Sequence, residues 1–336
     1  MKTPNPKILE IAQMADVSTA TVDRVLHGRS GVRSKTREKV LAAAEALRKG
    51  ELSASTRGNK NGLRVCVLLS EGGGSVNQTL RAALNKSAQA ADVQLHFESS
   101  PRMDAATQAK ALNKIRNGGF DGVILQPFEH PLVREEVAAL TESGAPVVTL
   151  LTSLTHPIGT YYVGLDNRSA GRAAALLLGR LIRKQGKVAL LIGGPLYRSH
   201  EEREIGFQSV IRRSFDDLRL LQPLDCSDDP DLIYREVTNL LETHDDLVGI
   251  CSICGGVRGL DRALREAGNR PDLVTIAFNL THLTRNALVS GTFDAVIHQD
   301  MTRIAERAIS VIRGNGPNAE RVSIVPTEII MSENVL

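Results

Sequence analysis

The chain has 336 residues, of which 42% are hydrophobic, 24% are charged and 3% are aromatic, with no tryptophan. This length and hydrophobic content predict more than one folded domain with a substantial core. No apolar run precedes the first charged helix, and no stretch approaches the roughly 20 apolar residues of a membrane span. We therefore expect a cytoplasmic protein without membrane contact, and the four cysteines suit a reducing compartment.

The positive charge is concentrated at the N-terminus. Residues 1–62 contain twelve Lys and Arg against six Asp and Glu, a net charge of +6, whereas the remaining residues carry a net charge of −3. A basic segment on a mildly acidic body indicates a polyanion as the partner of that segment alone. A generic basic surface is the alternative.

The first 26 residues have the pattern of two short amphipathic helices joined by a tight turn. Asn5 is a suitable N-cap with Pro6 at the first helical position, and apolar residues then recur at helical spacing. Ser18 is suited to cap a second helix, on which Val22, Val25 and Leu26 would face inward. With a third helix after it, this pattern predicts a DNA-reading helix-turn-helix, although a generic three-helix bundle has the same periodicity.

The rest of the chain has a different organisation. Residues 49–62 are small, polar and glycine-rich, and we expect them to form a linker. From residue 63 on, short apolar β runs alternate with helical stretches, which predicts buried parallel sheets. A second series of such runs follows residue 165, so we expect two doubly wound lobes with a ligand cleft at the carboxyl ends of their strands.

Several motifs carry a resemblance to a known family. The segment Ala15–Gly28, followed by Gly31-Val32 and Lys35–Val40, resembles the headpiece of lactose-repressor-type (LacI family) regulators. Further along, the order and spacing of five motifs resemble the sugar-binding domain of that family: Val163–Asn167 with Gly171, Gly193–Pro195, Arg203, Gly206-Phe207 and His298–Asp300. The resemblance implies a core with the fold of periplasmic sugar-binding proteins.

The expected fold class is thus an all-α helix-turn-helix head on an α/β two-lobed core, each lobe a doubly wound parallel sheet. The predicted boundaries are a head at 1–48, a hinge or linker at 49–62 and an effector-binding core at 63–336. Within the core we expect an N-lobe at about 63–164 and 299–325 and a C-lobe at about 165–298 and 326–336.

The resemblance also implies which residues of the head meet DNA. Thr19, Ala20 and Arg24 would read bases, since small residues let a helix approach base edges and arginine can bind guanine. The residues expected to lie near phosphates or to support the turn are Ser18, Thr21, His27 and Thr36.

This chain departs from the family pattern at three places. Asp16 replaces the usual glycine of the turn, and aspartate tolerates left-handed backbone better than most residues. Asp23 replaces the usual serine on the recognition helix, where it could accept from a cytosine amino group or hold Arg24. Residues 49–62 have no clear Tyr-x-Pro-Asn pattern or wedge leucine, which the family uses to enter the minor groove.

Candidate ligand residues follow the predicted strands. Arg203 matches the ligand arginine of the family and could bind vicinal hydroxyls or a carboxylate, whereas the alternative is a surface ion pair with Glu202 or Glu204. Asn279 stands where the family usually has an acidic group, and its amide suits a neutral polyol. The remaining candidates, each of which could instead serve local packing or the hinge, are Ser70, Phe128, Tyr197 and Gln299.

Other motifs predict no further chemistry. Gly72–Asn77 lacks the third glycine of a dinucleotide-binding loop, the Cys251–Cys254 pair has no partner pair, and His200–Glu204 is not HExxH. We therefore expect no cofactor, no metal and no catalytic residue.

These features predict a ligand-responsive transcriptional regulator, a repressor of a carbohydrate-related operon. It would bind a pseudo-palindromic double-stranded DNA operator as a homodimer or a tetramer, and a small sugar or polyol would close its cleft. The alternatives are a nucleobase or small acid as effector, an enzyme, and a solute-binding transport protein.

Overall fold

The computed structural model describes residues 6–48, 62–71, 74–156, 159–268, 270–314 and 321–335. It divides into two compact units, Met1–Asn61 and Gly62–Leu336, and each is described by itself. The predicted cap Asn5 and the predicted linker, apart from Gly62, lie outside the described residues. None of the helices described has the length and apolar character needed to cross a membrane.

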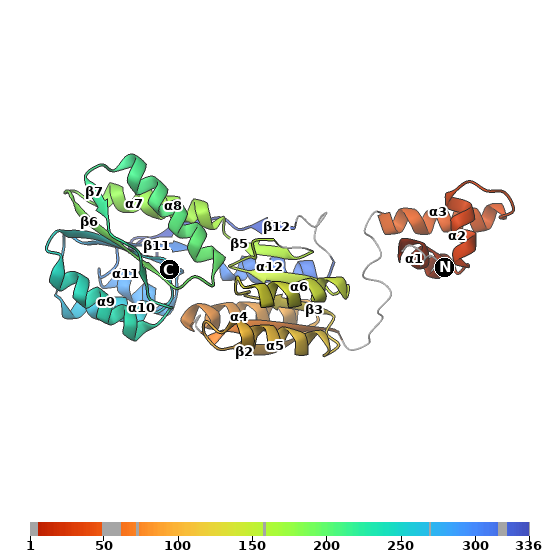
Figure 1. Cartoon of the computed structure of the whole chain (residues 1–336), viewed down its shortest axis with the longest axis horizontal. Helices are drawn as coiled ribbons and strands as arrows, with labels where there is room; N and C mark the ends of the chain where they lie inside the picture. Colours follow the sequence, from red (N-terminus) through yellow and green to blue (C-terminus); the bar gives the residue numbers. More distant parts are fainter. Residues whose placement is uncertain are drawn as a thin grey trace. The chain divides into compact units, whose positions relative to one another are not determined.

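The first unit contains α1 (Pro6–Ala15), α2 (Thr19–Leu26) and α3 (Ser34–Arg48) (Figure 1). Small and β-branched side chains form its core: Ile11, Ala12, Ala15, Val22, Val25, Val40 and Ala43. Leu26, which was predicted to face inward, is 42% exposed. It is the last residue of α2, and the buried stripe of this short helix is completed by Val22 and Val25 one turn apart.

Both ends of α2 are fixed by local hydrogen bonds. Asp16 in the preceding turn has φ +53°, the left-handed backbone that aspartate was expected to tolerate. Ser18 caps the helix, because its Oγ accepts a bond from the Thr21 amide at 3.3 Å. At the other end Gly28 has φ +66°, and the Arg29 amide donates to the carbonyl of Arg24 at 2.8 Å, which is the Schellman pattern.

The first sheet of the core unit is parallel in every pairing, in the order β12-β5-β4-β3-β1-β2. Its strands are β1 (Leu63–Ser70), β2 (Val93–Ser100), β3 (Gly122–Leu125), β4 (Val147–Leu150), β5 (Tyr161–Gly164) and β12 (Val322–Ile324). One face is covered by α4 (Gly74–Ala90) and α12 (Met301–Ile312), and the other by α5 (Ala105–Arg116) and α6 (Pro131–Glu142). The central strands read as continuous apolar runs because both faces are buried.

The second sheet repeats this arrangement in the order β13-β11-β10-β9-β6-β7, with β8 beside β6. Its strands are β6 (Gly186–Ile192), β7 (Leu218–Leu220), β8 (Leu224–Asp225), β9 (Leu247–Ser252), β10 (Val274–Phe278), β11 (Ala295–His298) and β13 (Glu328–Ile330), of which β13 is antiparallel. One face is covered by α7 (Asn167–Leu181) and α8 (Arg198–Ser214), and the other by α9 (Pro230–Thr243), α10 (Val257–Glu266) and α11 (His282–Val289). The predicted class, a helical head and two doubly wound parallel lobes, is confirmed (Figure 1).

Two glycines let α7 and α8 touch backbone to backbone. A Cβ on Gly171 would lie 2.1 Å from the carbonyl oxygen of Arg203, and one on Gly206 would lie 2.2 Å from that of Arg168. No real Cβ approaches a backbone atom this closely, so any other residue would separate the helices. Because α7 begins at the crossover from β5 and α8 carries Arg203, this contact fixes the arginine relative to the crossover.

Gly171→Ala should therefore destabilise the core and displace Arg203. We expect the free energy of unfolding to fall by roughly 1–3 kcal/mol, as for other overpacked sites. Urea unfolding followed by circular dichroism measures this loss. Leu176→Ala, at an exposed position of the same helix, is the control and should change the free energy by less than about 0.5 kcal/mol. Equal stability of Gly171→Ala and the original protein would contradict the packing argument.

Candidate functional site

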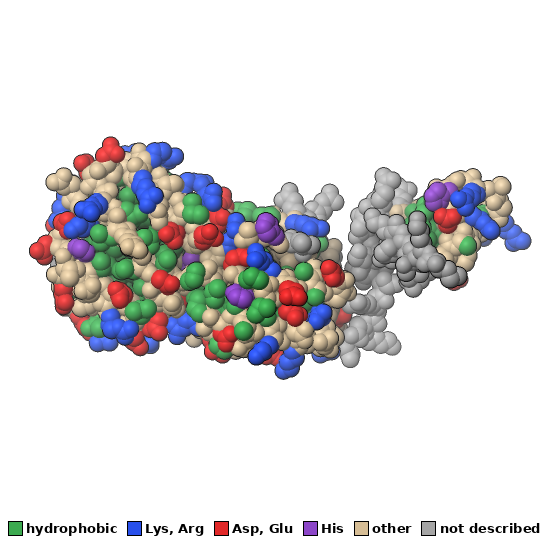
Figure 2. All heavy atoms as spheres, viewed as in Figure 1, with side chains coloured by type: hydrophobic (Ala, Val, Ile, Leu, Met, Phe, Trp, Pro, Cys, Tyr) green, Lys and Arg blue, Asp and Glu red, His purple; other side chains and the backbone are tan. Residues whose placement is uncertain are grey.

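The exposed face of α2 carries small side chains and one arginine, and further cations follow this helix. Ala20 and Arg24 are exposed, and Thr19 and Thr21 are half-buried. Ser18 and Thr21 are joined by a 2.9 Å hydrogen bond between their hydroxyls, so they stabilise the turn. Figure 2 shows Lys and Arg side chains gathered on the described part of the head. Exposed cations in that part include Arg24, Arg29, Arg33, Lys35 and Lys39.

Asp23 pairs with residues at and just beyond the C-terminal end of α2. Its carboxylate lies 3.1 Å from Nδ1 of His27 and 3.4 Å from Nη1 of Arg29. Asp23 was expected either to hold Arg24 or to accept from a cytosine amino group. In the described part of the head its carboxylate holds His27 and Arg29 instead of Arg24. Since the carboxylate is partly exposed, these pairs contribute little to stability.

The core unit contains a cavity of about 440 Å³ at the carboxyl ends of both sheets. The N-lobe contributes residues that follow β1, β3 and β4, including Asn77, Gln126 and Thr152. The C-lobe contributes residues that follow β6, β8, β9, β10 and β11. Parallel strands place their carboxyl ends at one edge of the sheet, so these polar side chains converge although they are distant in sequence.

Arg203 is buried in the cavity wall, with 3% of its surface exposed. Its Nε donates to Oδ1 of Asn167 at 2.8 Å, its Nη1 donates to the carbonyl of Ile253 at 3.2 Å, and the guanidinium lies 4.5 Å from the ring centre of Phe278. Burial lowers the pKa of Arg203 to about 10, so it remains a cation at neutral pH. Arg203 does not form the alternative surface pair, because Glu202 pairs with Arg168 and Arg198. Glu204 instead accepts a hydrogen bond from Gln208.

Asn167 extends this contact to the lobe crossing. Its Nδ2 donates to the hydroxyl of Tyr162 at 3.0 Å and to the carbonyl of Leu151 at 3.2 Å. The hydroxyl of Tyr162 donates in turn to the carbonyl of Leu165 at 2.7 Å. The crossover segment therefore fixes the orientation of Arg203.

Two buried polar atoms in the cavity wall lack a partner among the residues that the structure describes, Oε1 of Gln299 and Nδ1 of His200. Nε2 of Gln299 donates to Oδ1 of Asn279 at 2.9 Å, so the Gln299 side-chain oxygen, Oε1, points away from Asn279. Burial lowers the pKa of His200 to about 3, so the ring is neutral at physiological pH. Buried polar atoms are normally satisfied, so both are suited to a bound polar molecule.

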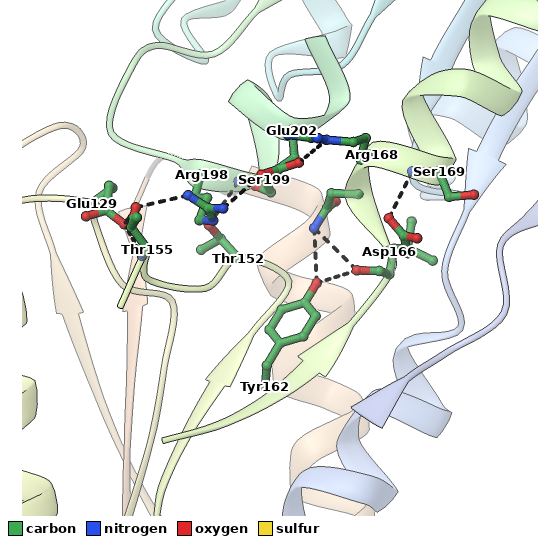
Figure 3. A network of polar contacts seen from close by, with 12 residues as sticks. Glu129, Thr152, Thr155, Tyr162, Asp166, Arg168, Ser169, Arg198, Ser199 and Glu202 are labelled. Atoms are coloured by element: carbon green, nitrogen blue, oxygen red, sulfur yellow. Dashed lines mark hydrogen bonds and ion pairs between the residues drawn. The ribbon is translucent and has the colours of Figure 1, made fainter. Parts of the chain in front are cut away.

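The two lobes are joined by polar contacts, of which the pair Thr152 and Ser199 lines the cavity (Figure 3). Arg198 at the start of α8 donates to Oγ1 of Thr155 at 3.0 Å, and the Ser199 amide donates to Oγ1 of Thr152 at 3.2 Å. The Glu129 amide also donates to the carbonyl of Leu196 at 2.8 Å. These contacts connect N-lobe loops to the helix that carries Arg203, so lobe closure and the position of the arginine are linked.

Comparison with known proteins assigns the two parts of the chain. Residues 7–48 match the family of bacterial regulatory proteins, lacI family, and residues 65–314 match the periplasmic binding protein domain. The chain belongs to the periplasmic binding protein domain family and has a lacI-family head.

Relatives of this lacI-type chain include regulators and sugar-binding proteins. An uncharacterised HTH-type transcriptional regulator in the aml 5′ region of Streptomyces limosus is 27% identical over 61% of this chain, which spans 58% of that relative. A xylitol-binding protein of Mycolicibacterium smegmatis is 23% identical over 74% of this chain and 71% of its own. A solute-binding protein from Agrobacterium vitis, solved with α-D-tagatopyranose, has a TM-score of 0.73 at 19% identity, covering 81% of this chain and 96% of its own, and thus shares the fold.

Four of the predicted ligand residues of the core line the cavity: Tyr197, Arg203, Asn279 and Gln299. The other two, Phe128 and Ser70, do not line it. Phe128 is fully buried behind Tyr197, with ring centres 5.3 Å apart, and Ser70 is a buried strand end that hydrogen-bonds Tyr197. Phe128 follows β3 and Ser70 is the last residue of β1, and both contact Tyr197, whose side chain comes from the other lobe and lines the cavity.

The sequence analysis missed several residues of the lining, above all Asp228. This side chain is 7% exposed, and its Oδ1 accepts a hydrogen bond from the Gly255 amide at 2.6 Å. Asp228 stands in a run of aspartates before a proline, a pattern that is typical of an ordinary turn.

The four cysteines, including the CxxC pair, are buried as free thiols, and burial raises the pKa of Cys66 and Cys226 to about 12.

Asp228→Asn should stabilise the ligand-free protein at neutral pH. Burial raises the pKa of Asp228 from 3.8 to about 6, so between these values the folded state keeps a proton that the unfolded state has released. The contribution of Asp228 to the free energy of unfolding therefore falls as pH rises through this window. Above pH 6 the buried carboxylate lowers the free energy of unfolding by at most about 3 kcal/mol.

Urea unfolding of both proteins at pH 7.5 and at pH 4.5 tests this expectation. The side-chain oxygen of asparagine can still accept the bond from the Gly255 amide, so the difference in unfolding free energy between the two proteins reports the buried charge. This difference should be smaller at pH 4.5. Equal differences at the two pH values would contradict the assignment.

Proposed function

We propose that this protein is a ligand-responsive transcriptional repressor of carbohydrate-related genes, rather than an enzyme. It binds a pseudo-palindromic operator as a homodimer, and its effector is a small neutral sugar or polyol. One observation supports this most strongly: a lacI-type helix-turn-helix occurs in the same chain as a two-lobed cavity, whose wall has polar atoms without a partner among the described residues.

The head supports operator binding through the N-terminal half of α2. The residues proposed to read bases are Thr19, Ala20 and Arg24, with Ser18, Thr21, His27 and Thr36 near phosphates or supporting the turn. A two-fold dimer requires a two-fold site, because each head reads one half of it.

The cavity supports a polyhydroxylated effector. A hydroxyl group both donates and accepts, so it can satisfy Arg203 and the free oxygen of Gln299 at once. A relative binds xylitol and a protein of the same fold was solved with a ketohexose, which is consistent with this ligand class.

Switching follows from the contacts between the lobes. An effector that binds the closed lobes more tightly shifts the population towards closure, and typical coupling free energies of this kind are about 1–3 kcal/mol. The shift would reach DNA through the segment between the head and the core.

Arg24→Ala should abolish operator recognition and leave ligand binding unchanged. Binding sites would first be selected from a random duplex library with the full-length protein. Fluorescence anisotropy at fixed salt should then show at least a 10-fold loss of affinity for the selected site, because one bidentate arginine–guanine contact discriminates by about 1–3 kcal/mol. Arg219→Ala, an exposed cation of the core, is the control. Full affinity of Arg24→Ala would refute the proposed reading face.

A thermal-shift panel tests the effector class. D-Ribose, D-arabinose, D-allose, D-tagatose and xylitol would be compared with adenine and D-gluconate. A true ligand at 100 times its Kd stabilises the folded state by about 2.7 kcal/mol. We expect at least one sugar or polyol to raise the melting temperature. A response to adenine or gluconate alone would reject the class proposed.

A further inference from the structure

The buried carboxylate of Asp228 is held in place by unusual backbone. Asp228 itself has φ +54°, a left-handed conformation that aspartate tolerates better than most residues. A Cβ on Gly193 would lie 2.1 Å from its Oδ1, and a Cβ on Gly255 would lie 3.2 Å from its Cγ. The absence of side chains at both glycines thus provides the space that the carboxyl group occupies in the cavity wall.

One oxygen of this carboxylate is used by the protein and the other is not. Oδ1 accepts the bond from the Gly255 amide, whereas Oδ2 has no donor within the described ranges of the chain. Since Asp228 is buried and lines the cavity, Oδ2 is an acceptor that a bound molecule can use. A buried carboxylate without further donors is costly, so a ligand that supplies one gains affinity.

The same loop also bonds a cation. The carbonyl of Ile253 accepts from Nη1 of Arg203, two residues before the amide that bonds Asp228. The bonds of Arg203 use Nε and Nη1, so Nη2 has no acceptor among the residues described. The loop after β9 therefore positions one free donor and one free acceptor in one cavity.

The other charges of the lining differ from this pair because they are exposed. Arg102 is exposed and lies 3.5 Å from Asp229. Glu71, Arg258 and His282 are also exposed to solvent, so water screens these groups. The buried charges that face the ligand are thus Arg203 and Asp228, which are opposite in sign. A further buried acceptor, Oε1 of Gln299, also lacks a donor in the described structure.

We propose that Asp228 is a specificity-determining residue that accepts a hydrogen bond from a ligand hydroxyl and thereby selects neutral polyols over the corresponding sugar acids. A hydroxyl can accept from Arg203 and donate to Asp228 or Gln299. A ligand carboxylate can only accept, so it leaves these acceptors unpaired and repels Asp228. This inference rests on the proposed function, because it concerns the same cavity and ligand class.

Isothermal titration of the full-length protein with matched pairs tests the proposal. The pairs are xylitol against D-xylonate, D-ribose against D-ribonate and D-arabinose against D-arabinonate. The original protein should bind the neutral member at least 10-fold more tightly in any pair that binds. Asp228→Asn should weaken neutral binding at least 10-fold and reduce the preference over the acid by a similar factor.

Asp231→Asn is the matched control, since it removes an exposed carboxylate three residues away that does not line the cavity. Neutral binding by Asp228→Asn within 2-fold of the original protein would overturn the inference and leave the proposed function intact. A preference of the original protein for an acid would also overturn it. If none of the neutral compounds binds, the proposed effector class fails together with the inference.

A pH series on the unaltered protein keeps the test decisive if Asp228→Asn does not fold. The charged groups that face this carboxyl group are Arg203, Arg102 and Asp225, and burial holds the pKa of the neighbouring His200 near 3. Neutral-ligand affinity should therefore fall at least 5-fold between pH 7.5 and pH 5, as the carboxylate becomes protonated. Unchanged affinity over this range would overturn the inference.

Discussion

The contact between α7 and α8 at Gly171 and Gly206 is the constraint on which the ligand site depends. Because no side chain separates the two backbones, Arg203 on α8 lies beside Asn167 at the start of α7. Asn167 is itself bonded to Tyr162 and Leu151 in the other lobe. The position of the buried cation is therefore set by the crossover between lobes, so a change in lobe arrangement also changes the ligand site.

The two buried charges of the cavity wall, Arg203 and Asp228, are held without a direct pair between them. Full pairing of Arg203 with Asp228 would satisfy both groups, but it would leave neither available. Instead, the backbone of the loop after β9 bonds one atom of each. This arrangement lowers the stability of the empty protein, and the proposed ligand would recover the loss by completing the hydrogen bonds. Differential binding of this kind is what a ligand needs in order to shift an equilibrium between two lobe arrangements.

Local patterns predicted most of the fold correctly. The cap at Ser18, the left-handed turn at Asp16 and the alternation of strands and helices all arise from interactions within a few residues. The family resemblance and the positions after parallel strands together placed Arg203, Asn279, Gln299 and Tyr197 at the cavity that the structure contains. Phe128 and Ser70 do not line it, since sequence position does not reveal which side chain lies nearest to the cavity.

By itself, the sequence determined a basic helix-turn-helix head, a two-lobed α/β core and the sheet edge where ligand residues gather. These follow from composition, periodicity and the spacing of strands. Tertiary structure alone decided which acceptors remain free and which charges are buried. Asp228 shows why: its burial, its bond to Gly255 and its space beside Gly193 depend on loops that are far apart in the chain. Desolvation and hydrogen bonding between distant segments have no local signature, so this carboxylate resembled an ordinary turn residue until the fold placed it in the cavity wall.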